Sequence, residues 1–542
     1  MSDTSTKLAA LSSSTRTFVG NRLAIDTRSL AVFRILLGVL VVGDVLSRSR
    51  NFHFYYTDDG VVTQELATWW TGDAFSFFYF TSDPTLIAVL FVVHALVGLQ
   101  LIVGYKTRIA TVVSFLFVIS LDHHNPLVLS YADTLFRLLF FWAIFLPLGE
   151  RWSVDAVHRT RKPRTVFVGL AGLFAMLQMI KMYFINGMHK FPSDLWQTGE
   201  GTPKVMGIDE MTYLLGDTLR EVPFLLTLGG RLWFYLLLSS PFLLLLAGRW
   251  RLPLVAFLMG GHASFAISVR IGAFAYVALT GLVLFVQTPF WEDANALLRW
   301  LGLDTSRLVP SKQRQKQLAS PFPSYSLDSQ RNRHRKADLY NATLGLVTVG
   351  IVVTVVALAL ATGGVIHEDV PMEERVDYTI ENTAGVEHVD TVANHFNIDQ
   401  PVWSIFAGPD PRTSDRYYVF PAKTEDGDHL DIYFERNLSY DRPYQELENQ
   451  HDTYRMRFYM NSIRRASSHN PAPELLADHL CETWEREHDT NITHLNMYTV
   501  REVITRETID DPENRDRSIH KLHEFTCSDT DIPREFAPPP ED

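Results

Sequence analysis

The stretch 183–199 places several reactive side chains at the end of an apolar segment. It runs Tyr-Phe-Ile-Asn-Gly-Met-His-Lys-Phe-Pro-Ser-Asp-Leu-Trp-Gln-Thr-Gly. A helical pattern meets Asn186-Gly187 and Lys190, and then a Pro-Ser-Asp turn beside Trp196. A lysine at the edge of an apolar cavity can lose its proton, because burial away from water disfavours the ammonium form. Lys190 could then act as a general base, although the spacing alone favours an interfacial anchor, the commoner role of lysine beside a membrane.

Further ionisable residues lie within or at the ends of apolar runs: Arg34, Asp44, His94, Arg137, Lys181, His262 and Arg270. A charge at the bilayer centre costs about 2.5–3.5 kcal/mol, so such residues normally face a protein interior or a watery cavity. Pairing between helices or snorkelling explains Arg34, Asp44 and Arg137 equally well. His94 alone is typical of an interhelical hydrogen bond. Taken together, these residues predict a polar pocket in the bundle.

Long apolar segments must position these side chains. We expect membrane spans at 30–46, 84–104, 109–121, 134–148, 164–185, 231–247, 252–270, 272–289 and 343–364. After about residue 365 the chain becomes polar and acidic and has no apolar run long enough to cross a bilayer. The sequence therefore predicts a polytopic α-helical membrane protein of about nine spans with a soluble α+β C-terminal domain.

The same shifts in composition define the expected domains. They are a cytoplasmic tail (1–29), a transmembrane domain (30–290), a basic cytoplasmic linker (291–342), a last transmembrane helix (343–364) and an outer domain with a disordered tail (365–542). Lys and Arg gather in the tail, in the linker and in the loops at 106–108, 159–164 and 249–251. The positive-inside rule makes these loops cytoplasmic, so the C-terminal domain of a nine-span protein in the cell membrane faces outward. The tail has no apolar core typical of a cleaved signal peptide.

The C-terminal domain alternates apolar and polar residues at 417–420 and 430–434, which predicts strands, whereas 454–465 and 474–485 have helical character. Its two cysteines, Cys481 and Cys527, could form a disulfide outside the cytoplasm or remain thiols in a reducing compartment. Histidines and acidic residues lack the spacing of metal ligands, so we expect no metal site. The net charge of −12 disfavours nucleic acid as a partner.

Two segments resemble the vitamin K-dependent gamma-carboxylase family. Tyr-Phe-Ile-x-Gly-x-x-Lys, ending at Lys190 and followed by Asp194 and Trp196, is similar to the segment that carries the catalytic base of the family. One extra residue precedes Trp196 here. Gly261-His262, followed by Ile-Gly-x-Phe-x-Tyr-Val at 271–277, resembles the family's functional histidine segment.

Other motifs resemble the bacterial and archaeal relatives of these enzymes, the horizontally transferred transmembrane domain (HTTM) proteins. They lie at 54–60, 133–137 and 146–149, so the resemblance covers about residues 25–290, and the segment at 403–406 resembles the C-terminal part of the same prokaryotic proteins. One departure stands out. Leu-Val-Leu-Ser-Tyr at 127–131 occupies the place of Asn-Asn-His-Ser-Tyr in the eukaryotic enzymes. His123, His124 and Asn125 could substitute only if the loop is rearranged.

The resemblance implies a membrane enzyme, a lyase or quinol epoxidase, that drives oxygenation of a reduced naphthoquinone. Its cofactor would be reduced vitamin K or menaquinone with O2 and CO2, and glutamate carboxylation of a peptide or protein would be an extension of the reaction. Lys190 and His262 would be catalytic, and the expected cofactor-binding residues are Asn186, Tyr131, Trp196 and Arg270. The alternative is a non-enzymatic membrane protein that binds quinone or lipid and presents an outer interaction domain. Both functions require contact with the lipid bilayer and a lipophilic ligand.

Overall fold

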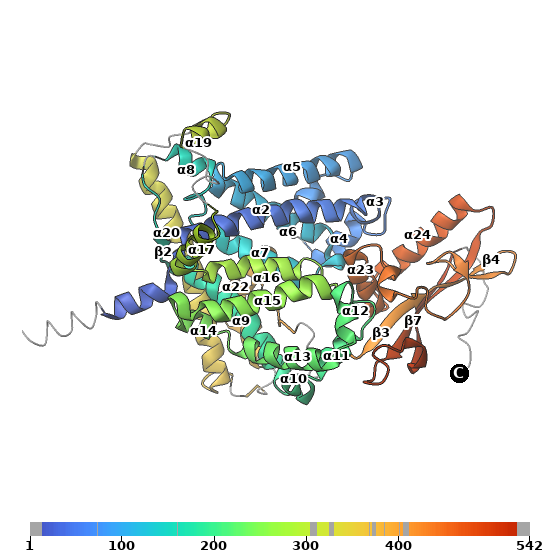
Figure 1. Ribbon diagram of the computed structural model, residues 1–542. Helices are drawn as coiled ribbons and strands as arrows, with labels where there is room; N and C mark the ends of the chain where they lie inside the picture. The colour runs from blue at the N-terminus through green and yellow to red at the C-terminus, as the bar shows by residue number, and fades with distance from the viewer. Residues whose placement is uncertain are drawn as a thin grey trace, which may run out of the picture.

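The structure is a computed structural model that describes residues 14–72, 74–159, 161–303, 312–324, 330–367, 369–370, 375–383, 385–399, 401–404 and 411–527. Helices make up most of the chain before residue 400, and a β-rich region lies at one end of them (Figure 1). The expected disordered tail after Pro533 and part of the expected linker fall outside the described residues.

Four helices in the described part of the chain are long and apolar enough to cross a membrane. They are α2 (Thr27–Ser49), α5 (Pro84–Val103), α9 (Leu170–Lys190) and residues 335–362 of α20 (Gln330–Thr362). A fifth span is possible if the bent pair Phe274–Phe285 and Thr288–Trp300, which turns by 100°, crosses as one unit. The protein is therefore a multi-pass membrane protein with four to five candidate spans.

The other predicted spans are also largely helical, but these helices are too short or too polar to meet the same test. They are α6 (Thr107–His124), α7 (Tyr131–Ala143), α13 (Pro223–Leu238), α14 (Phe242–Leu245), α15 (Leu252–Ser268) and α16 (Phe274–Leu282). The expected count of nine spans thus exceeds the count that helix length and apolarity support. Pro241 separates α13 from α14, because proline lacks the N–H that would continue the helix.

Two ends of predicted segments have a different structure from the one expected. Residues Val166–Phe167 form a short strand, β2, which pairs with β1 (Ile25–Asp26), so α9 begins only at Leu170. The start of the expected linker is helical, because α17 (Thr288–Trp300) extends into it. Shorter helices complete this half: α3 (Phe52–Tyr56), α4 (Gln64–Thr71), α8 (Val154–His158), α10 (Asp194–Thr198), α11 (Gly201–Met206), α12 (Leu215–Arg220) and α19 (Lys312–Ala319).

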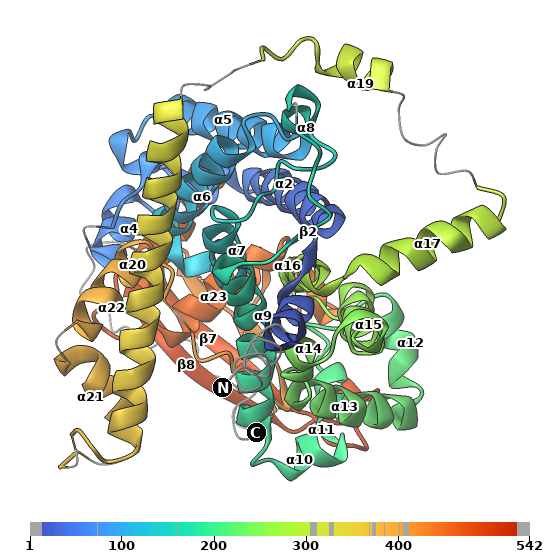
Figure 2. The same cartoon turned by 90° about the vertical axis from the view of Figure 1, so that its left-hand side faces the viewer.

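Helix α20 runs crosswise to α2 and α5 (Figures 1 and 2). Two short helices, α21 (Arg375–Asn382) and α22 (Val386–His395), pack beside it. After them the chain returns to the bundle, where Trp403 is fully buried in the main core. The segment beyond the last apolar helix therefore contributes to the packing of the membrane half.

The β-rich region is an antiparallel sheet of six strands, with β7 (Ile492–Val503) at its centre. One edge of β7 pairs with β3 (Ser414–Val419) and β4 (Pro421–Thr424), and its other edge pairs with β8 (Arg517–Thr526). Strands β5 (His429–Asp431) and β6 (Arg436–Asn437) extend the β4 side. Helices α23 (Tyr454–Arg465) and α24 (Ala472–Glu487) complete an α+β domain. The predicted helices at 454–465 and 474–485 are confirmed, whereas the expected strand at 430–434 ends at Asp431.

This domain packs directly on the helical half. One apolar core joins Tyr55, Phe78 and Leu127 of the helical half to Tyr418 and Tyr459 of the C-terminal domain. Helix α23 lies on the 3₁₀ turn Pro126–Val128, where the Ser462 hydroxyl donates to the Leu127 carbonyl at 2.8 Å. The two parts thus share buried apolar surface, which holds the C-terminal domain in a defined position.

Candidate functional site

The C-terminal end of α9 carries the first wall of the site. Tyr183, Asn186 and Lys190 are spaced by three and four residues, so they share one face of the helix. All three are buried, and the Lys190 side chain lines a cavity although only 3% of the residue is exposed. The helix ends at Lys190, because Pro192 follows two residues later and cannot continue the hydrogen-bonding pattern.

Trp196, on the short helix α10, forms the next part of the wall. The Nζ atom of Lys190 lies 3.9 Å from the centroid of the Trp196 ring, a cation–π distance. The chain can place Trp196 there because Gly199 adopts φ +85° directly after α10. A Cβ at Gly199 would lie 2.1 Å from the Thr227 carbonyl oxygen of α13, so glycine is required at this turn.

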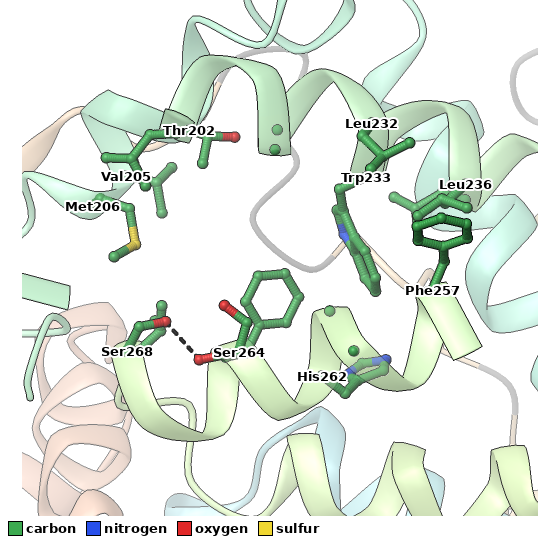
Figure 3. Close-up of a pocket in the computed structure, with 18 of the residues that line it drawn as sticks. Thr202, Val205, Met206, Leu232, Trp233, Leu236, Phe257, His262, Ser264 and Ser268 are labelled. Carbon is green, nitrogen blue, oxygen red and sulfur yellow. Dashed lines mark hydrogen bonds between the residues drawn. The ribbon is translucent and has the colours of Figure 1, made fainter. Parts of the chain in front are cut away.

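Helix α15 contributes His262 to the lining, on the side of the cavity that faces Thr202 and Val205 of α11 (Figure 3). The His262 Nε2 atom is 2.9 Å from the Tyr183 hydroxyl, and its buried Nδ1 atom has no hydrogen-bond partner among the described residues. The Trp233 ring of α13 meets the imidazole edge to face, with centroids 5.3 Å apart. Gly261 permits this approach, because a Cβ there would lie 2.3 Å from the Trp233 ring.

The cavity between α9, α11, α13 and α15 has a volume of about 450 Å³. Its lining is mainly apolar and includes Met206, Leu226 and Phe274. Three lining residues, Leu225, Leu232 and Phe257, are also exposed on the outside of the bundle by 51%, 47% and 56%. Because these side chains lie on helices α13 and α15, the cavity adjoins an exposed apolar surface of these two helices.

The expected polar pocket is not formed by the ionisable residues of the apolar runs. Of that group only His262 lines the cavity. Arg34 donates to four backbone carbonyls, among them those of Leu148 and Trp152. His94 stacks on Phe117 and, contrary to expectation, its ring nitrogens have no hydrogen-bond partner among the described residues.

The remaining residues of that group also lie outside the lining. Asp44 pairs with Arg48 and Arg455, and Arg137 pairs with Asp122. Lys181 is exposed on the surface of α9. Pairing between elements therefore accounts for the buried charges, and the cavity remains apolar.

The expected cofactor-binding residues fall into two groups. Asn186 and Trp196 line the cavity together with Lys190 and His262, whereas Tyr131 and Arg270 do not. The Tyr131 hydroxyl lies 2.9 Å from the Ser404 hydroxyl, and its ring stacks on Trp403. The Arg270 guanidinium donates to the backbone carbonyls of Glu448 and His451 in the C-terminal domain.

The returning segment 401–404 closes the Lys190 end of α9. The Asn186 side-chain amide donates to the Trp403 carbonyl at 2.8 Å, and His189 Nε2 lies 2.8 Å from the Val402 carbonyl. The C-terminal region thus fixes the orientation of Asn186 beside the cavity. This contribution has no sequence signal, because it depends on a contact between residues more than 200 positions apart.

The residues that could replace the missing family motif lie elsewhere. His123, His124 and Asn125 are buried and hydrogen-bond to the backbone of Phe75, Tyr56 and Tyr55, respectively. Neither they nor Leu127–Tyr131 line the cavity. Among the described residues no group of three or more His, Cys, Asp or Glu side chains could hold a metal ion.

Two site residues were missed by the sequence reasoning. Tyr183 could have been found, because it precedes Lys190 by seven residues and therefore shares its helix face. No sequence pattern indicated Trp233 as a site residue, because its position beside His262 depends on the packing of α13 on α15.

Comparison with known proteins supports the resemblance seen in the motifs. No curated protein and no solved structure matches the chain. The family model described as the HTTM domain matches residues 22–291, which contain α9, α13 and α15 and the whole described lining of the cavity. Over residues 22–291 the chain therefore belongs to the HTTM-domain family, which is vitamin K-dependent gamma-carboxylase-like.

Proposed function

We propose that this protein is a membrane enzyme that uses Lys190 as a base to drive oxygenation and epoxidation of a reduced naphthoquinone. The observation that supports it most is the shared cavity, in which a buried amine and a buried imidazole line the same apolar chamber of about 450 Å³. Such chambers, apolar with a few convergent polar groups, are typical of sites for lipophilic ligands. A glutamyl side chain of a peptide is the further substrate in the carboxylating form of the reaction.

The residues present fit a quinone. Its apolar ring and isoprenoid tail suit a lining of Leu, Phe, Trp and Met side chains, and its two ring oxygens need polar partners at separate points. Tyr183 and Lys190 are seven residues apart on α9, which corresponds to about 10 Å along the helix. Lys190 and the imidazole that bonds Tyr183 therefore lie at different ends of the chamber, where each can meet one oxygen.

Lys190 takes the proton of a ring hydroxyl, for which it must carry a neutral amine. Its apolar surroundings favour the proposal, because little water reaches a residue that is 97% covered and burial disfavours the charged form. A reduced vitamin K or menaquinone held by this lining would, together with O2, supply the base strength needed to remove a glutamyl γ-proton, so that CO2 could add to the carbon and quinone epoxide and water would be the by-products.

His262 stabilises negative charge on the opposite oxygen. If the Tyr183 hydroxyl donates to Nε2, the imidazole proton resides on Nδ1, the buried atom that has no partner among the described residues. A buried donor of this kind is complementary to a developing oxyanion. Trp233 holds the imidazole plane, so Tyr183 and Trp233 act as positioning residues.

We also propose that the Lys190 end of α9 and the C-terminal domain face outward. The basic loops at 159–164 and 249–251 lie toward the opposite end of the bundle, near α8 and α14 (Figure 1). Cys481 and Cys527 form a disulfide, which is typical of an oxidising compartment. Quinone would then enter through the lipid-facing wall near Leu225 and Phe257.

The test is an epoxide assay on the full chain in membranes supplied with reduced menaquinone and O2. We expect epoxide from the wild type and from Lys181→Ala, whose lysine is on the same helix but exposed, and at least about 100-fold less from Lys190→Ala. Equal epoxide from all three chains would remove Lys190 as the base. Quinone binding without epoxide in any chain would favour the alternative, a binding protein that presents its outer domain.

A further inference from the structure

A second pocket, of about 320 Å³, lies in the C-terminal domain between the sheet and the end of α23. Four arginines line it: Arg412 before β3, Arg416 on β3, Arg464 on α23 and Arg501 on β7. Thr413, Thr499 and His520 add polar groups to the same lining. This composition is opposite to that of the apolar cavity, and the proposed quinone chemistry makes no use of it.

The arrangement of these arginines costs stability unless an anion is present. Arg416 and Arg501 are directly opposite each other on the paired strands β3 and β7, where like charges destabilise a sheet. Burial, and after it the guanidinium groups of Arg412 and Arg464, lower the pKa of Arg416 to about 9. The protein thus holds several cations close together in a partly buried place.

The carboxylate found at the pocket neutralises only part of this charge. Glu210 pairs with Arg412, whose Nη2 atom is nevertheless buried without a hydrogen-bond partner among the described residues. Arg464 donates to the neutral side-chain oxygen of Asn461 at 3.1 Å. His520 contacts the Ser518 hydroxyl, again a neutral group. The lining therefore retains a surplus of positive charge and of N–H donors.

We propose that this arginine pocket, formed by Arg412, Arg416, Arg464 and Arg501, binds a multiply charged oxyanion. Guanidinium groups offer paired N–H donors that match the oxygens of phosphate, sulfate or clustered carboxylates. The pocket volume of about 320 Å³ suits one such group. Two sources supply this chemistry, a free phosphate and the carboxylates of an acidic peptide, and binding to either is independent of the proposed quinone reaction.

The experiment uses the full chain in nanodiscs of neutral phosphatidylcholine, with thermal unfolding measured in phosphate, in sulfate and in chloride of equal ionic strength. We expect phosphate and sulfate, but not chloride, to raise the midpoint of unfolding in a saturable way, because a ligand of the folded state stabilises it. Arg501→Gln should abolish this rise and also raise the midpoint without phosphate, since it relieves the repulsion with Arg416. A purely structural arginine would not produce this pair of effects.

Arg465→Gln is the matched control, because Arg465 adjoins Arg464 on α23 but is exposed and outside the pocket lining. It should keep the phosphate response. In calorimetry, Arg464→Gln should weaken phosphate binding by about tenfold or more. Equal responses to phosphate in the wild type, Arg501→Gln and Arg464→Gln, or an equal response to chloride, would overturn the proposal.

A hexaglutamate peptide distinguishes the two sources. If the peptide binds more tightly than phosphate and Arg501→Gln abolishes peptide binding, carboxylates are supported as the ligand. If phosphate binds more tightly than the peptide and Arg501→Gln abolishes phosphate binding, a phosphoryl or free phosphate group is supported as the ligand.

Discussion

At the scale of the residue, Lys190 depends on groups from three elements. Helix α9 carries Lys190, and Trp196 of α10 covers its amine. The returning segment contributes through Asn186, one turn before Lys190, whose side-chain amide donates to the Trp403 carbonyl. His262 depends in the same way on Tyr183 and Trp233. These contacts fix both side chains at the wall of the cavity.

His262→Phe tests the imidazole with little change in volume. We expect menaquinone still to bind, because the wall remains apolar, and epoxide formation to fall about 100-fold, the usual cost of removing one oxyanion donor. His94→Phe is the control, since His94 is also buried among aromatic rings but lies outside the cavity. A similar loss in both variants would contradict the proposed role of His262.

Gly260 offers a way to obstruct the cavity. It lines the chamber, and a Cβ built on it meets no atom within 4 Å, so a side chain can leave the backbone there without a clash. Gly260→Leu should weaken menaquinone binding by at least about tenfold while helix propensity preserves the fold. Gly345→Leu, at an equally open position of α20, should bind menaquinone like the wild type. Unchanged binding in Gly260→Leu would argue against this cavity as the quinone site.

The placement of these residues could be predicted only in part. Lys190 and His262 were identified by resemblance, and Asn186 and Trp196 follow from their closeness to Lys190 in the chain. Tyr131 and Arg270 were also expected near the quinone from the resemblance, but Tyr131 contacts Ser404 and Arg270 binds the C-terminal domain. Their true partners are distant in sequence, so no local pattern indicates them.

At the scale of the element, a buried ionic cluster joins the helices to α23. Arg48 of α2 lies 2.6 Å from Asp122 of α6, and Arg455 of α23 pairs with Asp133 of α7 at 3.0 Å and with Asp44. Burying these charges is costly, and the cluster is stable only while each carboxylate keeps its partner.

Arg455→Ala should therefore destabilise the protein by about 3–5 kcal/mol, because it leaves Asp44 and Asp133 short of a buried cation. The exposed Arg465, in the last turn of the same helix, is the control, and its change to alanine should cost less than about 0.5 kcal/mol. Thermal unfolding in nanodiscs measures both. Equal stability of the two variants would show that the cluster does not hold α23 in place.

The helices could be predicted more completely than the strands. Apolar runs and caps such as Asp83 with Pro84 mark helix ends within the chain. The central strand β7 was not predicted, because twelve residues with a mixed pattern become a strand only when β3, β4 and β8 pair with it. Fewer helices in the described part of the chain meet the test of length and apolarity than the nine spans expected, because apolar composition also occurs in short helices.

At the scale of the whole molecule, the C-terminal domain is part of the architecture of the site. Its returning segment contacts α9, and Gly272, with φ +62°, lets Tyr454 pack against the turn after α15. The domain and the cavity are thus held in one arrangement, and the proposed outward orientation exposes both to the same side.

The orientation is testable because Cys481 and Cys527 are the only cysteines in the chain. On intact cells, a membrane-impermeant reductant followed by an impermeant maleimide should label them, and no label should appear without reduction. Labelling that requires permeabilised cells would place the domain in the cytoplasm.

Cys527→Ser should also lower the stability of the domain by up to about 4 kcal/mol, because the disulfide closes a loop with a sequence separation of 46 residues.

Photocrosslinking with a diazirine-bearing menaquinone tests the central claim most directly, because it reports where the ring lies. The label should appear on peptides from the end of α9 and from α15 around His262. Excess unmodified menaquinone should reduce this labelling, and so should the Gly260→Leu substitution. Labelling confined to the lipid-exposed helices α5 and α20, unchanged in that variant, would contradict a quinone site between Lys190 and His262.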